Sequence, residues 1–153
     1  IAGQDPEKSG MGTTLVAATI SEGKVYIVNI GDSRLYVIGT DIIQLTRDHS
    51  YVQDLVNKGE LDEKDARLHP KKNVITKAIG VSGELGADYF EYELKEGERI
   101  LMCSDGLTNM IEDRDIRSIV RSRSDISSAV EALVDSANEC GGIDNISVIL
   151  IEP

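Results

Sequence analysis

Three aspartates could act together on a metal ion. Each lies at one end of an apolar run that predicts a buried strand: Asp32 after run 28–30, Asp105 after run 100–103 and Asp144 before run 146–151. A carboxylate at the end of a core strand is held by rigid backbone and still reaches solvent, which suits a ligand for a hard cation. A single Ser-Asp-Gly sequence such as 104–106 is equally typical of a turn. Three such aspartates in one small chain predict a site.

The elements that must position these aspartates are short strands and two longer helices. The pattern of apolar residues predicts strands over 15–20, 25–30, 34–38, 42–46, 88–94, 98–103 and 146–151. The short connections between the first four strands predict antiparallel neighbours, and Lys95-Glu96-Gly97 predicts a hairpin between 88–94 and 98–103. We expect turns at Gly31-Asp32-Ser33 and at 104–106.

Helical patterns occur in two places. A helix is expected from Ser50 to Gly59, followed by a shorter one from Asp62. Because the segment 48–73 is mostly polar, we expect it to be a surface excursion between strands. Two amphipathic helices are expected after residue 113, and the second has a full apolar stripe at helical spacing over 126–137. Because each of these two helices has a single apolar face, we expect both to cover one side of a sheet.

Composition excludes several classes of function. The 153 residues carry 27 acidic and 16 basic side chains, for a net charge of −11, so nucleic acid and anionic membranes are poor partners. No apolar run approaches the roughly 18–20 residues of a membrane span. We do not expect residues 1–6 to be a secretory signal peptide, because they lack a basic start and an apolar stretch. The two cysteines, Cys103 and Cys140, lack metal-type spacing and predict a reduced, cytoplasmic protein. Cys103 should be inert, because an apolar strand surrounds it.

Six short motifs occur in a fixed order from residue 11 to residue 145. They are Met11-Gly12-Thr13-Thr14, Gly31-Asp32-Ser33-Arg34, Leu45-Thr46-Arg47-Asp48-His49-Ser50, Ile75-Thr76-Lys77-Ala78-Ile79-Gly80, Ser104-Asp105-Gly106-Leu107 and Gly142-Ile143-Asp144-Asn145. With these motifs the chain resembles the C-terminal part of the metal-dependent serine/threonine protein phosphatases of type 2C, in their bacterial form.

The resemblance implies a fold and a chemistry. The fold is an α+β arrangement, an antiparallel β-sandwich flanked by helices (α-β-β-α), here incomplete at its N-terminal side. The chemistry is hydrolysis of phosphoserine and phosphothreonine by water activated between two Mn²⁺ or Mg²⁺ ions, with a possible third ion. Paired ions lower the pKa of bound water and neutralise phosphoryl charge. The substrates would be phosphoproteins, with a serine/threonine kinase as the expected cognate partner.

Individual roles follow from the resemblance motif by motif. Asp105 and Asp144 would bind the two metal ions, and Asp32 together with Asp105 would bind the third ion. Asn145 would orient a ligand or a water molecule. The segment 48–73 would be the flap beside the site, within one domain over 1–153. Ser33 and Arg34 are equally consistent with structural roles, Arg34 by pairing with an acid near the turn.

The chain departs from the family at its N-terminal side. The arginine with an Asn-Glu-Asp-type segment that receives phosphate is absent, as is the Asp-Gly-x-Gly-Gly-His motif with the central bridging aspartate. The chain also starts without methionine. We therefore expect a truncated chain that binds metal weakly, turns over little, and leaves sheet edges and apolar faces uncovered.

Three alternatives remain open from the sequence. The chain could be a degenerate phosphatase that acts as a regulatory or protein-binding module. It could be a cytosolic β-rich interaction domain whose aspartates only form turns. The third alternative, a serine hydrolase built on Ser33, needs a histidine partner, and only His49 and His69 are available. For His49, the simpler expectation is a hydrogen-bonded loop residue.

Overall fold

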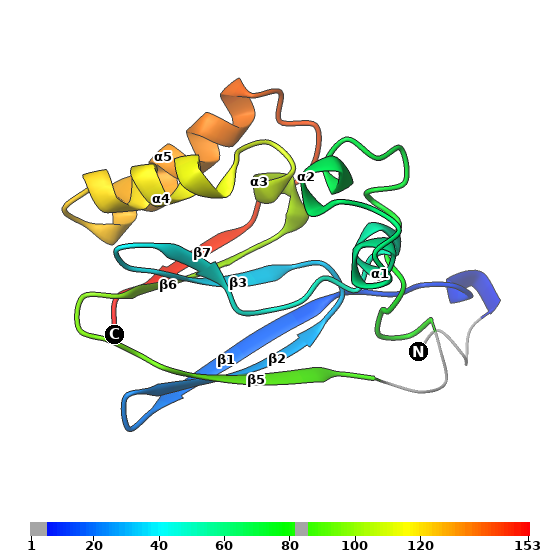
Figure 1. The fold of residues 1–153 in the computed structure, drawn as a ribbon, viewed down its shortest axis with the longest axis horizontal. Coiled ribbons are helices and arrows are strands. Elements are labelled where there is room, and N and C mark those ends of the chain that lie inside the picture. The colour runs from blue at the N-terminus through cyan, green and yellow to red at the C-terminus, as the bar shows by residue number, and fades with distance from the viewer. Residues whose placement is uncertain (1–5, 82–85) are drawn as a thin grey trace.

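Two antiparallel sheets face each other, and a pair of helices covers the outer side of one of them (Figure 1). A computed structural model describes residues 6–81 and 86–153. The strands are β1 (Leu15–Ser21), β2 (Lys24–Ile30), β3 (Arg34–Ile38), β4 (Ile42–Gln44), β5 (Asp88–Glu93), β6 (Arg99–Cys103) and β7 (Val148–Ile151). Their order is β1-β2-β5 in one sheet and β4-β3-β6-β7 in the other.

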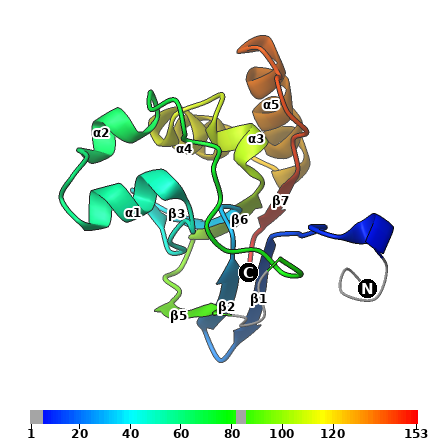
Figure 2. The same cartoon turned by 90° about the vertical axis from the view of Figure 1, so that its right-hand side faces the viewer.

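The helices lie between and after the strands. They are a 3-10 turn (Pro6–Lys8) and the α-helices α1 (Tyr51–Asn57), α2 (Glu63–Ala66), α3 (Asp105–Thr108), α4 (Asp113–Ser122) and α5 (Ile126–Glu139). As expected, α4 and α5 lie together on the β4-β3-β6-β7 sheet, while α1 and α2 lie to one side of α3 (Figure 2). In the described part of the chain, no helix combines the length and apolar character that a membrane span needs.

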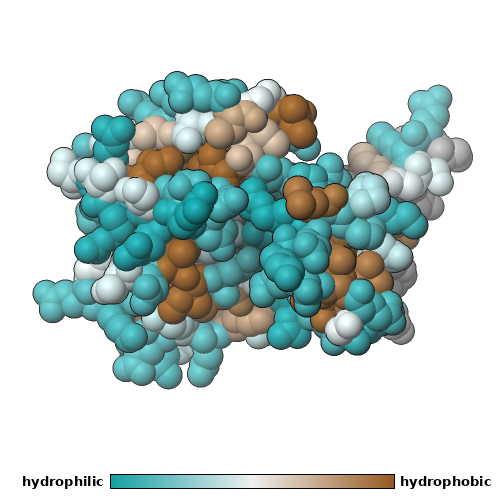
Figure 3. Space-filling model, turned by 45° about the horizontal axis from the view of Figure 1, so that its top comes forward, coloured by the Kyte–Doolittle hydropathy of each residue, from teal (hydrophilic) through white to brown (hydrophobic). Residues whose placement is uncertain are grey.

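Two apolar layers hold this arrangement together. Between the sheets, Val25, Ile27, Leu35, Val37 and Ile100 form one core. Between the second sheet and the helices lies a larger core, whose buried members include Tyr36, Leu101, Leu107, Ile116 and Leu133. Because β3 and β6 contribute to both cores, their residues are buried on both faces. The apolar stripes of α4 and α5 are therefore explained by burial against this sheet. Figure 3 shows separate apolar patches on a mainly hydrophilic surface, in keeping with the acidic composition.

The outer face of the β1-β2-β5 sheet is not covered by any described helix (Figure 1). Tyr26 and Tyr89 project from this face, and Tyr89 is 75% exposed. The layers in the described residues are therefore α-β-β. The expected α+β sandwich is confirmed, including its incompleteness on one side.

Two expected strand pairings are wrong. The predicted hairpin between 88–94 and 98–103 does not form, because β5 pairs with β2, whereas β6 pairs with β3 and β7. Ile100 and Leu101 are fully buried, which requires partners on both sides of β6, and β5 instead completes an edge of the opposite sheet. Likewise β2 and β3 are not neighbours, since the turn 31–33 carries the chain from one sheet to the other.

Several boundaries also differ from expectation. A turn is expected at 104–106, but Asp105 begins the short helix α3, which extends to Thr108. Strand β4 ends at Gln44 and β7 begins at Val148, so both strands are shorter than predicted. The helix from Ser50 is confirmed, with Ser50 Oγ accepting a hydrogen bond from the backbone N–H of Gln53 at 3.2 Å.

Candidate metal centre

Asp32 lies in the turn that joins the two sheets. Gly31, just before it, has a φ of +107°, a conformation that favours glycine. The backbone N–H of Gly31 donates to His49 Nδ1 at 3.0 Å, and the backbone N–H of His49 donates to Gly31 O at 2.9 Å. Ser33 Oγ lies 3.0 Å from Thr14 Oγ1. The turn is thereby fixed on both sides of the half-buried Asp32.

Asp105 is the first residue of α3, directly after the core strand β6. Asn109 lies one helical turn later, and its Nδ2 donates to Asp105 Oδ2 at 3.1 Å. The side chain of Asn109 therefore orients this carboxylate. Gly106 allows a close approach to the neighbouring loop, because a Cβ at this position would lie 2.3 Å from the carbonyl oxygen of Asn145.

The loop that carries Asp144 and Asn145 is tied to the start of α3 by Ser104. Ser104 Oγ donates to Asn145 O at 3.1 Å and accepts from the backbone N–H of Ser147 at 3.0 Å. Within the loop, the backbone N–H of Asn145 donates to Asp144 Oδ1 at 2.7 Å. Asp144 itself is exposed. The hydroxyl of Ser104 thus keeps the two aspartate-bearing segments, 104–106 and 144–145, together.

The negative charge of Asp105 is repelled by the charges of both Asp32 and Asp144. Burial raises the pKa of Asp32 to about 6, and the negative charge of Asp105 adds to this effect. Burial also raises the pKa of Asp105, and the charge of Asp144 is the next largest cause. Asp105 therefore has an unfavourable charge interaction with each of the other two aspartates. A divalent cation would relieve this repulsion.

These residues fit a hard cation in their chemistry but do not enclose one. Carboxylate oxygens are the ligands that Mg²⁺ and Mn²⁺ prefer. Among residues 6–81 and 86–153, however, no group of three His, Cys, Asp or Glu side chains is arranged to hold an ion. The described residues therefore supply carboxylates of the right chemistry but do not bring all three into one complete set of ligands.

A cavity of about 460 Å³ adjoins Asp32 and Asp105. Residues of α1, α2 and α4 contribute to its lining, and its basic side chains are Arg34, Lys64, Arg67, Lys72 and Arg114. A second hollow of about 500 Å³ lies on the outer face of the β1-β2-β5 sheet, between Tyr26 and Tyr89. None of the three aspartates lines that hollow, whereas Asp32 and Asp105 line the first cavity together with its basic side chains.

The structure also decides several sequence expectations about nearby residues. Arg34 pairs with Asp48, as expected for a structural role at the turn. Both ring nitrogens of His49 are engaged, Nδ1 by Gly31 and Nε2 by Asp88, and Ser33 pairs with Thr14. This arrangement does not support a serine hydrolase. The expectation that Cys103 is inert is supported, because burial raises the pKa of its thiol to about 12.

Sequence reasoning missed Ser104 and Asn109 as supports of the site. The four-residue spacing from Asp105 to Asn109 would have indicated a contact if a helix had been expected there. The role of Ser104 depends on a contact with residues more than 40 positions away, so no local pattern could have indicated it.

Comparison with known proteins decides the family. The family model described as protein phosphatase 2C matches residues 2–142. The chain belongs to the protein phosphatase 2C family. The serine/threonine phosphatase stp of Listeria innocua is 41% identical over 152 residues, which are 99% of this chain and 60% of that protein.

Solved structures of protein phosphatase 2C members share the fold. Serine/threonine phosphatase Stp1 from Staphylococcus aureus superposes with a TM-score of 0.95 at 37% identity, covering 99% of this chain and 61% of that one. The catalytic domain of the serine/threonine protein phosphatase PstP, solved with two manganese ions, gives a TM-score of 0.86 at 30% identity, with coverage of 97% and 62%. The chain thus spans about 60% of the length of the relatives it matches.

Proposed function

We propose that this chain is part of an enzyme that hydrolyses phosphoserine and phosphothreonine on proteins at a binuclear Mn²⁺ or Mg²⁺ site. The observation that carries the proposal is that Asp32 and Asp105 line one cavity, while Ser104 holds the loop with Asp144 against the start of α3. Membership of the protein phosphatase 2C family and the manganese-bound PstP relative support it.

The proposed roles divide among few residues. Asp105 and Asp144 hold the two ions, and Asp32 shares a third, weaker ion with Asp105. When bound, such ions activate water and neutralise phosphoryl charge. Asn145 orients a ligand or a water molecule, while Asn109 holds the Asp105 carboxylate in one direction.

The neighbouring cavity is the proposed place for the phosphorylated segment of the substrate. Basic side chains from α2 and α4 line it beside the acidic residues, which suits a phosphate group. Residues 48–73, which include α1 and α2, would act as the flap of a single domain over 1–153. Substrates would be phosphoproteins in the cytoplasm, among them a cognate serine/threonine kinase.

Because the set of ligands is incomplete, we expect different activities for the 153-residue chain and for a longer version of it. The 153-residue chain should bind Mn²⁺ weakly and turn over little, because its three aspartates do not enclose an ion. A version extended upstream to the length of its relatives should hydrolyse a phosphothreonine peptide with Mn²⁺. Comparable activity of both versions would contradict the expected difference between them. Inactivity of the extended version would overturn the proposed function.

The same incomplete set of ligands also favours a second candidate, a degenerate phosphatase that serves as a regulatory or protein-binding module. In that case Asp105 and Asp144 would be relics, and the extended protein would not bind Mn²⁺. Isothermal titration of the extended protein with Mn²⁺ separates the two candidates.

A further inference from the structure

His49 holds both backbone polar groups of Gly31, the residue that precedes Asp32. Its Nδ1 accepts from the Gly31 N–H at 3.0 Å, and its own backbone N–H donates to Gly31 O at 2.9 Å. The side chain is buried, with the residue 5% exposed. We propose that His49 is a positioning residue for the Asp32 carboxylate, kept in the required tautomer by Asp88. The inference rests on the proposed function, in which Asp32 contributes to the metal centre.

The contacts of the ring define its tautomer. A backbone N–H can donate only to a ring nitrogen that carries no proton, so Nδ1 is unprotonated. The ring proton is therefore on Nε2, which lies 3.2 Å from Asp88 Oδ2. Lys77 Nζ lies 3.6 Å from the other carboxylate oxygen of Asp88 and 3.3 Å from His49 Nε2. Because an ammonium group has no acceptor, the partner for a proton on Nε2 is Asp88 and not Lys77. The hydrogen bond from Nε2–H to Asp88 keeps the proton on Nε2, which leaves Nδ1 free to accept from Gly31.

The turn before Asp32 needs such a partner because glycine at position 31 allows many backbone conformations. Glycine at a φ of +107° has no side chain to restrict its backbone, and a Cβ here would collide with the side chain of Thr14. The close approach to Thr14 thus excludes other residues, and the direction of Asp32 must be fixed by hydrogen bonds. His49 supplies two of them, while Asn29 Nδ2 donates a longer one to Gly31 O at 3.3 Å.

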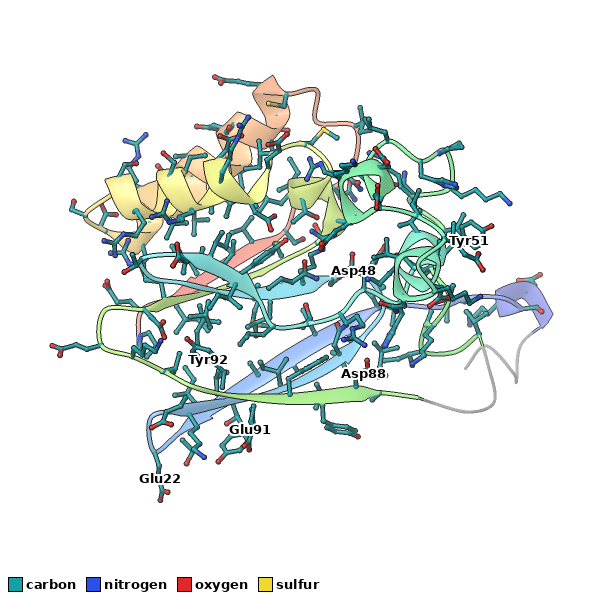
Figure 4. The ribbon with its side chains drawn as sticks, in the orientation of Figure 1. Glu22, Asp48, Tyr51, Asp88, Glu91 and Tyr92 are labelled. Carbon is teal, nitrogen blue, oxygen red and sulfur yellow. The ribbon has the colours of Figure 1, made fainter. Side chains whose placement is uncertain are left out.

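The same residue connects three separate segments to the metal centre. His49 directly precedes Ser50, which caps α1, and its carbonyl oxygen accepts from the backbone N–H of Thr76 at 2.8 Å. Its ring reaches Asp88 at the start of β5, which Figure 4 shows below α1. Placement of Asp32 therefore depends on the base of the proposed flap and on the edge of the β1-β2-β5 sheet. Neither is adjacent to Asp32 in the sequence.

Two substitutions of His49 separate the contact with Gly31 from the contact with Asp88. In His49→Asn, the amide oxygen takes nearly the position of Nδ1 and can still accept from Gly31, whereas the contact with Asp88 is lost. In His49→Gln, the longer side chain can still donate to Asp88 but does not present an acceptor to Gly31. Both variants are made in the protein extended to the length of its relatives, and their thermal unfolding is recorded first.

Two readouts are then compared, the amide hydrogen exchange of Gly31 by NMR and the affinity for Mn²⁺ by isothermal titration. His49→Gln should expose the Gly31 amide to exchange and weaken Mn²⁺ binding at the site that Asp32 shares with Asp105 by about 10–100-fold, the usual effect of losing an outer-shell partner. His49→Asn should stay close to the unsubstituted protein in both measurements. A general loss of stability cannot produce this difference, because it would affect both variants.

A third variant removes the Asp88 carboxylate without altering the ring of His49. Asp88→Ala removes the acceptor for Nε2–H, so the ¹⁵N spectrum of the His49 ring should change from the Nε2–H tautomer to a mixture, with faster exchange at Gly31. An unchanged tautomer would overturn the assigned role of Asp88. Unchanged Mn²⁺ affinity in His49→Gln would overturn the role of His49, provided that the unsubstituted protein binds Mn²⁺. Failure of that protein to bind would overturn the proposed function itself, together with this inference.

Discussion

The guanidinium of Arg34 lies against the carboxylate of Asp48, with Nη2 2.7 Å from Oδ2 and Nε 3.0 Å from both carboxylate oxygens. Arg34 Nη1 also donates to Tyr36 Oη at 2.8 Å, and Tyr36 Oη donates to Asp113 Oδ1 at 3.2 Å. Figure 4 shows Asp48 beside α1, where the chain leaves the sheet. This network therefore joins β3 to the entrance of α1 and to the start of α4, next to the cavity that Asp32 and Asp105 line.

Breaking the Arg34–Asp48 pair should destabilise the fold. Arg34→Met leaves a mostly buried carboxylate without its cation, so the free energy of unfolding in urea should fall by about 1–3 kcal/mol. Arg34→Lys should recover only part of this loss, because one ammonium cannot replace a planar fork of donors. Arg114 is the matched control, since its ion pairs with Glu112 and Asp115 involve a side chain that is 79% exposed. An effect of Arg34→Met no larger than that of Arg114→Met would contradict the structural role.

The metal-free protein should become less stable as the pH rises from about 4 to about 6. Asp32 has a pKa of about 6 in the folded chain, compared with an ordinary value of 3.8. Between these values the folded protein keeps a proton that the unfolded chain has lost, so the stabilising contribution present below pH 4 disappears as pH rises through 6. The pKa of Asp105 is also raised in the folded chain, so Asp105 contributes to the same loss of stability as the pH rises.

Asp32→Asn should remove this pH dependence in part. In the presence of a chelator the variant should melt at a higher temperature than the unsubstituted protein at pH 7, with a smaller difference at pH 4. Thermal unfolding followed by circular dichroism measures both. A lower melting temperature for Asp32→Asn at pH 7 would mean that the Asp32 carboxylate is not under electrostatic strain.

The sequence could predict the strands but not all of their partners. Alternating apolar residues locate β1, β2, β3 and β6 to within a residue or two, because burial of one or both faces fixes that pattern. A short turn such as 31–33 carries the same signal whether it joins neighbours in one sheet or crosses between sheets. The loop at Gly97 is a second turn of this kind, because it joins β5 of one sheet to β6 of the other. Strand pairing depends on which edges remain available after packing, which is not a local property of the chain.

The candidate site could likewise be predicted from the sequence only in part. The three aspartates could be named from the sequence because each lies beside an apolar run that predicts a strand, although β7 itself begins only at Val148. Their supports could not, because Ser104 and His49 act through residues 18 or more positions away. Their roles in binding metal remain predictions.

Gly106 should tolerate no side chain, although alanine normally favours a helix. A Cβ would lie 2.3 Å from the carbonyl oxygen of Asn145, and a backbone oxygen held by Ser104 cannot rotate away. Gly106→Ala should lower the free energy of unfolding by about 1–3 kcal/mol through overpacking. It should also weaken Mn²⁺ binding, because the segments with Asp105 and Asp144 must separate. Gly86→Ala is the control, since its Cβ would meet only the side chain of Lys77 at 3.7 Å. Equal stability of the two variants would contradict this packing.

The two cysteines should react very differently. Cys103 is 4% exposed and its pKa is raised to about 12 by burial, whereas Cys140 is exposed at the end of α5. At pH 8 an aromatic disulfide reagent should therefore modify one thiol per native chain and two thiols in denaturant. Cys140→Ser should abolish the native reaction. Rapid modification of Cys103 in the native protein would show that the core around β6 opens readily.

The central claim is that Asp32, Asp105 and Asp144 converge on divalent cations, and anomalous diffraction tests it most directly. Crystals of the protein extended to the length of its relatives, grown with Mn²⁺, would be measured on both sides of the manganese absorption edge. We predict two strong anomalous peaks within coordination distance of the Asp105 and Asp144 carboxylates, with a weaker third peak shared by Asp105 and Asp32. Fully ordered carboxylates without manganese density beside Asp105 would contradict the account.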